Sequence, residues 1–189
     1  MNQGPRPRYP AELACDITTR EGATLHLRPI RPDDAGPLIE FHRRLSPRSV
    51  YRRFFFAHPV LSPAEVERFT TVDYVSRLAL VVEDGDRLVA VGRYEGAPGA
   101  PEAEVAFVVS DEHQHHGIAT ILLEHLARAG RDRGITTFVA STLADNRAML
   151  DVFTHSGFSL VTRVDEGVVD VRFPIGPRPG PDPPAPEAP

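Results

Sequence analysis

The residues with the clearest potential for chemistry lie in the stretch 102–126, where a loop of histidine and glycine joins an apolar run to a helical pattern. Val105 to Val109 is apolar and rich in valine, which predicts a buried strand. From Ile118 onward the apolar residues have the spacing of an amphipathic helix. A strand that enters a helix through such a loop directs backbone N–H groups and the positive end of the helix dipole at one point. That point can bind an anion and suits a diphosphate.

Gly117 and Ala119 fit this interpretation because small residues let a phosphate approach the backbone closely. An ordinary strand–loop–helix, in which the glycine serves only the turn, would show the same pattern, and these residues alone do not separate the two. The loop has neither the Lys-Ser/Thr of a P-loop nor the G-x-G-x-x-G of a dinucleotide-binding fold.

Glu104 is the candidate catalytic group. It stands in the otherwise apolar segment 103–109, in a sheet that we expect to be covered on both faces. A carboxylate that is partly desolvated becomes a stronger base, which suits proton abstraction near neutral pH. The alternative is a solvated side chain that points outward near the end of the strand.

The remaining sequence predicts the elements that position these residues. Their order is typical of an α/β (mixed α+β) protein with a central mixed, twisted sheet and helices on both faces. The expected strands are 15–30, as a hairpin or one interrupted edge strand, then 77–83, 87–94, 103–109, 135–141, 158–164 and 168–173. The expected helices begin at Pro32 and Pro47 and then cover 63–71, with a capping box at Ser62, 117–133 and 145–155.

The composition sets further limits. At 189 residues the chain has the size of one domain with some tail. We expect a flexible segment at 1–14, the folded domain at 15–173 and a disordered, proline-rich tail at 174–189. The net charge of −5 argues against a general nucleic-acid binder. No stretch is apolar enough to span a membrane, no signal peptide is recognisable and Cys15 stands alone, so we expect a cytoplasmic protein without an internal disulfide.

All 21 basic residues of the chain are arginine, and it contains no lysine. Arginine stays protonated, so the α-amino group at Met1 is the one amine in this chain that acylation could reach near neutral pH. A basic segment interrupts the acidic sequence at Arg43, Arg44, Arg48, Arg52 and Arg53. It fits a docking surface for an acidic protein and an ordinary solvated helix face equally well.

Two motifs indicate a family. The segment 114–119, Q-H-H-G-I-A, follows the V-A-F-V-V strand and resembles the coenzyme A motif of the GNAT acetyltransferases, Arg/Gln-x-x-Gly-x-Gly/Ala. The segment 146–158 resembles a second signature of that family, and the order of elements over about 24–173 resembles the GNAT fold. Segments 27–56, 70–82 and 103–109 are similar to the GNAT domain of bacterial protein lysine acetyltransferases that modify AMP-forming acyl-CoA synthetases.

This resemblance implies an acetyl-CoA-dependent N-acetyltransferase in which Glu104 is the general base. It implies that the pantetheine arm pairs, like an added strand, with the backbone of Phe107, Val108 and Val109, and that the loop and helix start hold the diphosphate. Asn146 would hydrogen-bond the arm, cap its helix, or do both. The expected contacts to acetyl-CoA are Phe107, Val108, Val109, Gln114, His115, His116, Gly117, Ile118, Ala119, Thr120, Asn146 and Phe153.

The sequence departs from the family pattern at two places. Phe153 stands where many relatives have a tyrosine that protonates the thiol, so here the thiolate leaves as such or takes its proton from water. His115 and His116 stand where basic residues are frequent, so the charge of the loop depends on pH. Adjacent histidines without acidic or cysteine partners are a weak indication of metal binding, and we expect no metal.

The leading hypothesis is a protein lysine Nε-acetyltransferase that acts on an acyl-CoA synthetase by direct transfer, with no nucleic-acid or membrane partner. An acetyltransferase for a small amine, such as an antibiotic or a polyamine, would use the same site. A coenzyme A-binding module that regulates a partner without turnover is the third hypothesis, and Glu104 argues against it. The sequence leaves the oligomeric state open.

Overall fold

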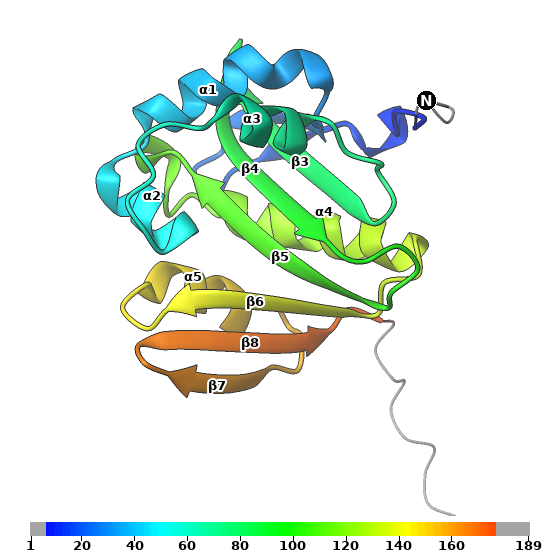
Figure 1. Ribbon diagram of the computed structural model, residues 1–189, viewed down its shortest axis with the longest axis vertical. Helices are drawn as coiled ribbons and strands as arrows, with labels where there is room; N and C mark the ends of the chain where they lie inside the picture. Colours follow the sequence, from blue (N-terminus) through cyan, green and yellow to red (C-terminus); the bar gives the residue numbers. More distant parts are fainter. Residues whose placement is uncertain (1–6, 177–189) are drawn as a thin grey trace, which may run out of the picture.

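The centre of the protein is an eight-stranded mixed sheet with the spatial order β1-β2-β3-β4-β5-β6-β8-β7 (Figure 1). The structure, a computed structural model, describes residues 7–176. Neighbouring strands are antiparallel except β5 and β6, which are parallel. The strands are β1 (Cys15–Thr18), β2 (Thr24–Pro29), β3 (Arg77–Asp84), β4 (Arg87–Glu95), β5 (Glu102–Val109), β6 (Thr137–Leu143), β7 (Val161–Asp165) and β8 (Val168–Pro174). The helices are α1 (Ala35–Arg44), α2 (Pro47–Phe54), α3 (Pro63–Thr70), α4 (Ile118–Asp132) and α5 (Arg147–Thr154), with 3-10 turns η1 (Ala11–Leu13), η2 (Pro32–Asp34) and η3 (Asp111–His113).

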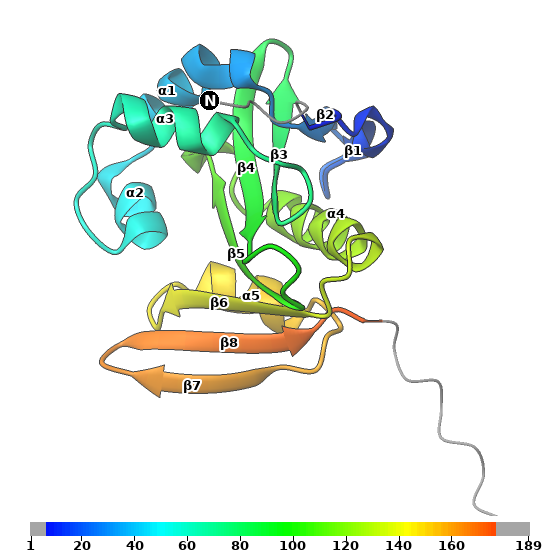
Figure 2. The ribbon, with the colours of Figure 1, turned by 45° about the vertical axis from the view of Figure 1, so that its right-hand side comes forward.

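Helices cover both faces of the sheet, which confirms the predicted architecture. Helices α1, α2 and α3 lie on one side and α4 on the other (Figure 2). Helix α4 buries Leu122 and Leu126, and it approaches β4 closely because that strand has Gly92 at the contact. A Cβ at Gly92 would lie only 3.2 Å from the Leu122 Cβ. None of the helices within residues 7–176 has the length and apolar character needed to cross a membrane.

Side-chain caps determine where helices begin. The Ser62 hydroxyl accepts the N–H of Glu65, whose carboxylate accepts the Ser62 N–H, so the predicted capping box is confirmed. The Ser46 hydroxyl caps α2. The first helix begins at Ala35, later than predicted, because Pro32–Asp34 form a 3-10 turn before it.

The packed domain extends beyond the expected 15–173 at both ends. The Tyr9 ring makes an edge contact with Tyr74 at 5.8 Å between centroids, and the Arg31 guanidinium lies 4.6 Å over the Tyr9 ring. Strand β8 continues to Pro174, and Ile175 after it is completely buried. The rest of the expected terminal segments, at 1–6 and 177–189, lies outside the described residues.

A buried ion-pair network joins β2, η2 and β3. The Arg28 guanidinium donates to both carboxylate oxygens of Asp34 at 2.8 Å and to Glu83 at 2.6 and 3.1 Å. Burial alone would raise the pKa of Asp34, but hydrogen bonds from Arg28 and from the Arg31 N–H outweigh it and lower the pKa. Ionised Asp34 therefore stabilises the folded chain.

Replacing Asp34 with Asn should lower the free energy of unfolding by about 3 kcal/mol near neutral pH, because Arg28 loses a buried partner. The folded-state pKa of Asp34 lies below its ordinary value of 3.8, so its contribution is complete above that pH and is lost as the pH falls below it. Urea unfolding of both proteins should show the difference shrinking in acid. Asp33→Asn, at an exposed neighbour, is the control. A difference that is independent of pH would contradict the assignment.

Candidate active site

The parallel pair β5–β6 is short and opens into a wedge. Only Glu102, Ala103 and Glu104 of β5 pair with β6, at Thr137–Val139. Beyond Glu104, β5 remains paired with β4 and β6 with β8, so the two strands separate (Figure 1). The wedge lies toward the carboxyl ends of parallel strands, which is where open α/β sheets bind ligands.

A cavity of about 400 Å³ occupies this wedge. Its walls come from β5, β6, α2, α5, the loop 110–117 and the start of α4, and Arg20 reaches it from the β1–β2 hairpin. The predicted residues that line it are Glu104, Phe107, Val108, Val109, Gln114, His115, Gly117, Ile118, Ala119, Thr120, Asn146 and Phe153. The fold therefore brings together the predicted site residues, with the exception of His116.

The edge of β5 that faces the wedge carries backbone groups without a strand partner. The Ser110 N–H donates to the Val89 carbonyl oxygen at 2.8 Å, which places Ser110 in the ladder with β4. Because backbone direction alternates along an antiparallel strand, the N–H and C=O groups of Phe107 and Val109 face the wedge and those of Val108 face β4. Val108 thus lines the cavity, but its backbone N–H and C=O groups face β4, contrary to the predicted pairing of all three residues.

The loop 110–117 is held against β5 and α2 by hydrogen bonds. The Gln114 amide donates to the Val109 carbonyl oxygen at 3.1 Å and to the Ser49 hydroxyl at 3.0 Å. The Asp111 carboxylate accepts the Ser46 N–H at 2.9 Å and the hydroxyls of Ser46 and Ser49 at 2.7 and 2.8 Å. Burial alone would raise the pKa of Asp111, but these hydrogen bonds lower it. Sequence reasoning missed both serines because nothing near them in the chain indicates a partner so distant in sequence.

Gly117 directly precedes α4 as its N-terminal cap residue and has a left-handed conformation, with φ 85°, which favours glycine. No side chain caps this helix, and its first intrahelical bond runs from the Ile121 N–H to the Gly117 carbonyl oxygen at 3.1 Å. Within residues 7–176 the N–H groups of Ile118, Ala119 and Thr120 have no acceptor, and these residues line the cavity. Three free donors and the positive end of a helix dipole make this end of the cavity suitable for an anion.

Glu104 lies where the two strands part, and its side chain is exposed at the cavity. The predicted desolvation is therefore wrong, because the separation of β5 and β6 leaves this face of the strand uncovered. Arg53 of α2 lines the same cavity. Burial lowers the pKa of the Arg53 guanidinium, and the nearby Glu104 carboxylate acts in the opposite direction. Position in the cavity, rather than burial, therefore distinguishes Glu104 as the candidate base.

Two predicted contacts differ from expectation. The His116 ring does not line the cavity, and its Nε2 lies 3.3 Å from a carboxylate oxygen of Glu21, so the ring is not directed at the anion site. Asn146 is buried and donates from Nδ2 to the Thr142 hydroxyl at 3.3 Å, and its side chain does not cap α5. The capping alternative for Asn146 is therefore wrong.

The basic segment 43–53 does not form one surface. Arg43 pairs with Glu40, and Arg44 donates to the backbone of β4, whereas Arg52 and Arg53 line the cavity. The segment thus supplies two guanidinium groups to the α2 side of the site. No group of three His, Cys, Asp or Glu side chains suited to a metal ion occurs within the described part of the chain.

An anion site at one end of a wedge between parallel strands, with a carboxylate at the other end, defines a site for an elongated anionic donor and its acceptor. The model of the Acetyltransferase (GNAT) family matches residues 47–158, which is more than half of the chain. The chain belongs to this family and is an acyltransferase.

Named relatives and a solved structure agree with this assignment. Acetyltransferase PA5475 of Pseudomonas aeruginosa is 32% identical over 142 residues, which cover 73% of this chain and 76% of that protein. Acetyltransferase Pat of Mycolicibacterium smegmatis is 32% identical over 167 residues, which cover 85% of this chain and 49% of that protein, so the chain spans about half the length of this relative. The crystal structure of the GNAT domain of S. lividans PAT has a TM-score of 0.82 and 42% identity, with 88% of this chain and 99% of that chain covered.

Replacing Gly117 with Val should weaken the binding of coenzyme A by at least about 100-fold, because the anion site loses several charge-assisted hydrogen bonds. A Cβ there would lie 3.1 Å from the Arg20 Cγ, and a branched side chain is strained at this φ. Gly167→Val is the matched control, since Gly167 has φ 84°, no neighbour within 4 Å and a place in the β7–β8 hairpin. Calorimetry should show near-normal affinity for the control alone. A folded Gly117→Val protein with wild-type affinity would disprove the anion site.

Proposed function

We propose that this chain transfers the acetyl group of acetyl-CoA to the Nε atom of a lysine on a protein substrate, an AMP-forming acyl-CoA synthetase, with Glu104 as the general base. The observation that carries the proposal is the position of Glu104 where β5 and β6 part, in the same cavity as the uncapped start of α4. The similarity to the acetyltransferases named Pat supports a protein acceptor. The choice of an acyl-CoA synthetase rests on the resemblance of segments 27–56, 70–82 and 103–109.

The residues present fit acetyl-CoA. The free N–H groups of Ile118, Ala119 and Thr120 would hold the diphosphate. The N–H and C=O groups of Phe107 and the N–H of Val109, on the edge of β5 that faces the wedge, would pair with the amides of the pantetheine arm, as an added strand does. The Val109 carbonyl oxygen already accepts a hydrogen bond from Gln114. An N–H of that edge would polarise the thioester oxygen. These sites follow one another along the wedge, which suits an extended ligand.

The transfer needs an uncharged amine next to the thioester. Lysine has an ordinary pKa of about 10.4, so Glu104 removes one proton from the ammonium group before attack. The amine nitrogen then attacks the thioester carbon, the C–S bond breaks and its electron pair leaves on sulfur. The nitrogen, now bonded to the acetyl carbon, loses its second proton to water and becomes the amide. Phe153, which is buried in the cavity wall 6.4 Å from the Phe107 ring, has no hydroxyl. The thiolate therefore takes its proton from water.

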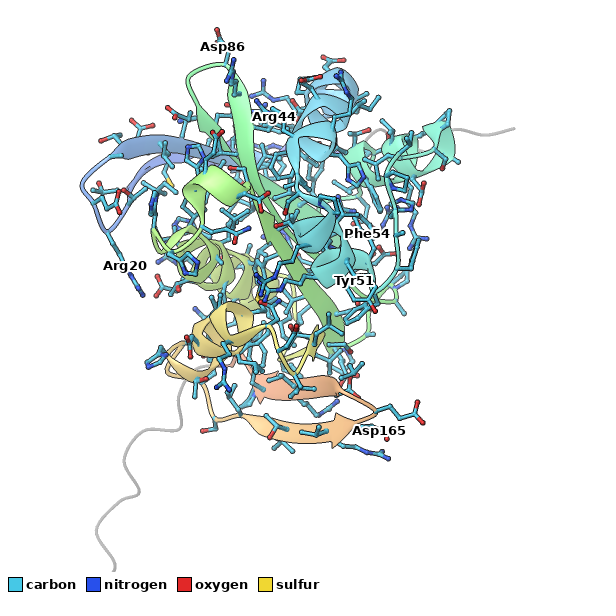
Figure 3. All side chains as sticks on the ribbon, turned by 90° about the vertical axis from the view of Figure 1, so that its left-hand side faces the viewer. Arg20, Arg44, Tyr51, Phe54, Asp86 and Asp165 are labelled. Carbon is cyan, nitrogen blue, oxygen red and sulfur yellow. The ribbon has the colours of Figure 1, made fainter. Side chains whose placement is uncertain are left out.

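The α2 side of the cavity favours a large acceptor. Tyr51 and Phe56 expose about half of their surface, at 49% and 54%, and Phe55 both lines the cavity and is exposed. Tyr51 and Phe54, labelled in Figure 3, lie on α2, the helix that contacts β5. Exposed aromatic side chains beside a cavity are typical of protein interaction surfaces. A small amine bound in the cavity would not contact these exposed aromatic side chains.

The acceptor can be tested with acetyl-CoA and a panel that contains a purified AMP-forming acyl-CoA synthetase, spermidine and an aminoglycoside. Thiol release and the intact mass of each acceptor should show transfer to the synthetase and little to the small amines. Transfer to the small amines alone would contradict a protein substrate. No transfer to any acceptor, with coenzyme A bound, would favour a binding module.

Replacing Glu104 with Gln should lower kcat/KM by about 10²- to 10⁴-fold, the usual effect of losing a general base. The affinity for coenzyme A should remain, because Glu104 lies away from the anion site. Glu102→Gln, on the same strand and with its side chain paired to Arg172, is the control. Unchanged turnover by the Glu104 variant between about pH 7 and pH 9 would rule out this role.

The absence of lysine predicts that the enzyme does not acetylate its own side-chain amines. Incubation of the untagged chain with excess acetyl-CoA, followed by intact-mass analysis, should show no acetylation beyond the N-terminus. Every acetyl-lysine in a two-protein assay would then lie on the substrate. A stable acetyl group elsewhere would indicate an acyl-enzyme at a serine, histidine or Cys15, and so a two-step mechanism.

A further inference from the structure

We infer that Arg20, in the turn between β1 and β2, is a ligand of the anion site and binds the diphosphate of coenzyme A through its guanidinium group. The inference rests on the proposed use of coenzyme A. It adds a residue from a part of the chain far from both the Q-H-H-G-I-A segment and α5.

The β1–β2 turn is docked onto the loop 110–117. The Arg20 N–H donates to the His116 carbonyl oxygen at 3.0 Å, and the Glu21 carboxylate lies 3.3 Å from His116 Nε2. Within the turn, the Gly22 N–H donates to the Thr19 carbonyl oxygen at 3.0 Å. The backbone of Arg20 is therefore held at a defined place relative to the loop.

The Arg20 side chain lies across the start of α4. A Cβ at Gly117 would be 3.1 Å from the Arg20 Cγ and 3.2 Å from its Nε, so the missing side chain of the glycine makes room for the arginine. Arg20 lines the cavity, and Figure 3 shows its side chain extending from the tip of the hairpin. Within residues 7–176 its guanidinium forms no ion pair or hydrogen bond, so its donors are available to a ligand.

The charge of the site makes this arginine necessary. The loop 110–117 contains two acidic residues, Asp111 and Glu112, and no arginine or lysine. Its histidines carry a positive charge only when protonated. The other arginines in the cavity wall, Arg52 and Arg53, belong to α2 on the acceptor side.

Arg20 therefore supplies a permanent charge beside the free N–H groups of α4. Its planar guanidinium suits bidentate binding of phosphate oxygens. Because it lies against Gly117, at the helix start, the diphosphate rather than the 3′-phosphate of coenzyme A is its partner.

Calorimetry with three ligands tests this assignment. Coenzyme A carries both phosphate sites, dephospho-coenzyme A retains the diphosphate, and pantetheine has neither. Arg20→Met keeps an apolar stem over Gly117 and removes the charge. It should weaken the binding of coenzyme A and of dephospho-coenzyme A equally, by about 10- to 100-fold, and leave pantetheine binding unchanged. Arg20→Lys should recover part of the loss, and the wild-type affinity should fall more steeply with salt than that of Arg20→Met.

The control is Arg87→Met, which removes an exposed charge from another hairpin; its neighbour Asp86 lies far from Arg20 in Figure 3. Thermal unfolding should give similar melting temperatures for both variants. Unchanged binding of coenzyme A by Arg20→Met would overturn the inference about Arg20 and leave the proposed function intact. A loss of affinity for coenzyme A but not for dephospho-coenzyme A would assign Arg20 to the 3′-phosphate. An equal loss of affinity for pantetheine would mean that Arg20 only supports the loop. Either result would overturn the inference. A wild-type protein that binds none of the ligands would overturn the proposed function as well.

Discussion

The early separation of β5 and β6 is the constraint on which the site depends. Each strand keeps its other neighbour, so neither can close the gap after Glu104. Buried backbone groups need hydrogen-bond partners, and the edge at Phe107 and Val109 has none from β6. A ligand with amide groups can satisfy that edge, while helix α4, which crosses from β5 to β6, places its uncapped start at the same opening. One local break in a sheet thus makes the cavity, the pairing edge and the anion site together.

The anion site is held by elements that are remote in sequence. Asp111 and Gln114 attach the loop 110–117 to α2 and β5, and Arg20 attaches it to the β1–β2 turn. Each attachment uses a hydrogen bond to a backbone group, so the position of the loop is specified without a large apolar contact. Donors that are fixed before a ligand arrives lose little conformational entropy on binding. The loop therefore acts as a pre-organised site, although it is exposed in several places.

The chemistry of the site depends on position more than on unusual residues. Glu104 is exposed, and Phe153, in the cavity wall, has no hydroxyl that could donate a proton. In the proposed mechanism, the contribution of the protein is to place an amine, a thioester and a carboxylate in one wedge, which is the larger part of catalysis for an acyl transfer between reactive groups. The guanidinium of Arg53, which belongs to α2, lies in the field of the Glu104 carboxylate and lines the same cavity.

The sequence by itself determined the elements, the capping box at Ser62, the mixed sheet and the family, because periodicity, caps and a loop motif are local signals. It also singled out Glu104 and the start of α4 as candidates, and the fold places both at one cavity. Only the tertiary structure decided that Glu104 is exposed, that His116 faces Glu21 and that Arg20 lies over Gly117. Those facts depend on where the pairing of β5 with β6 ends and on which hairpin contacts the loop 110–117. Such contacts join residues far apart in the chain, and neither composition nor spacing records them.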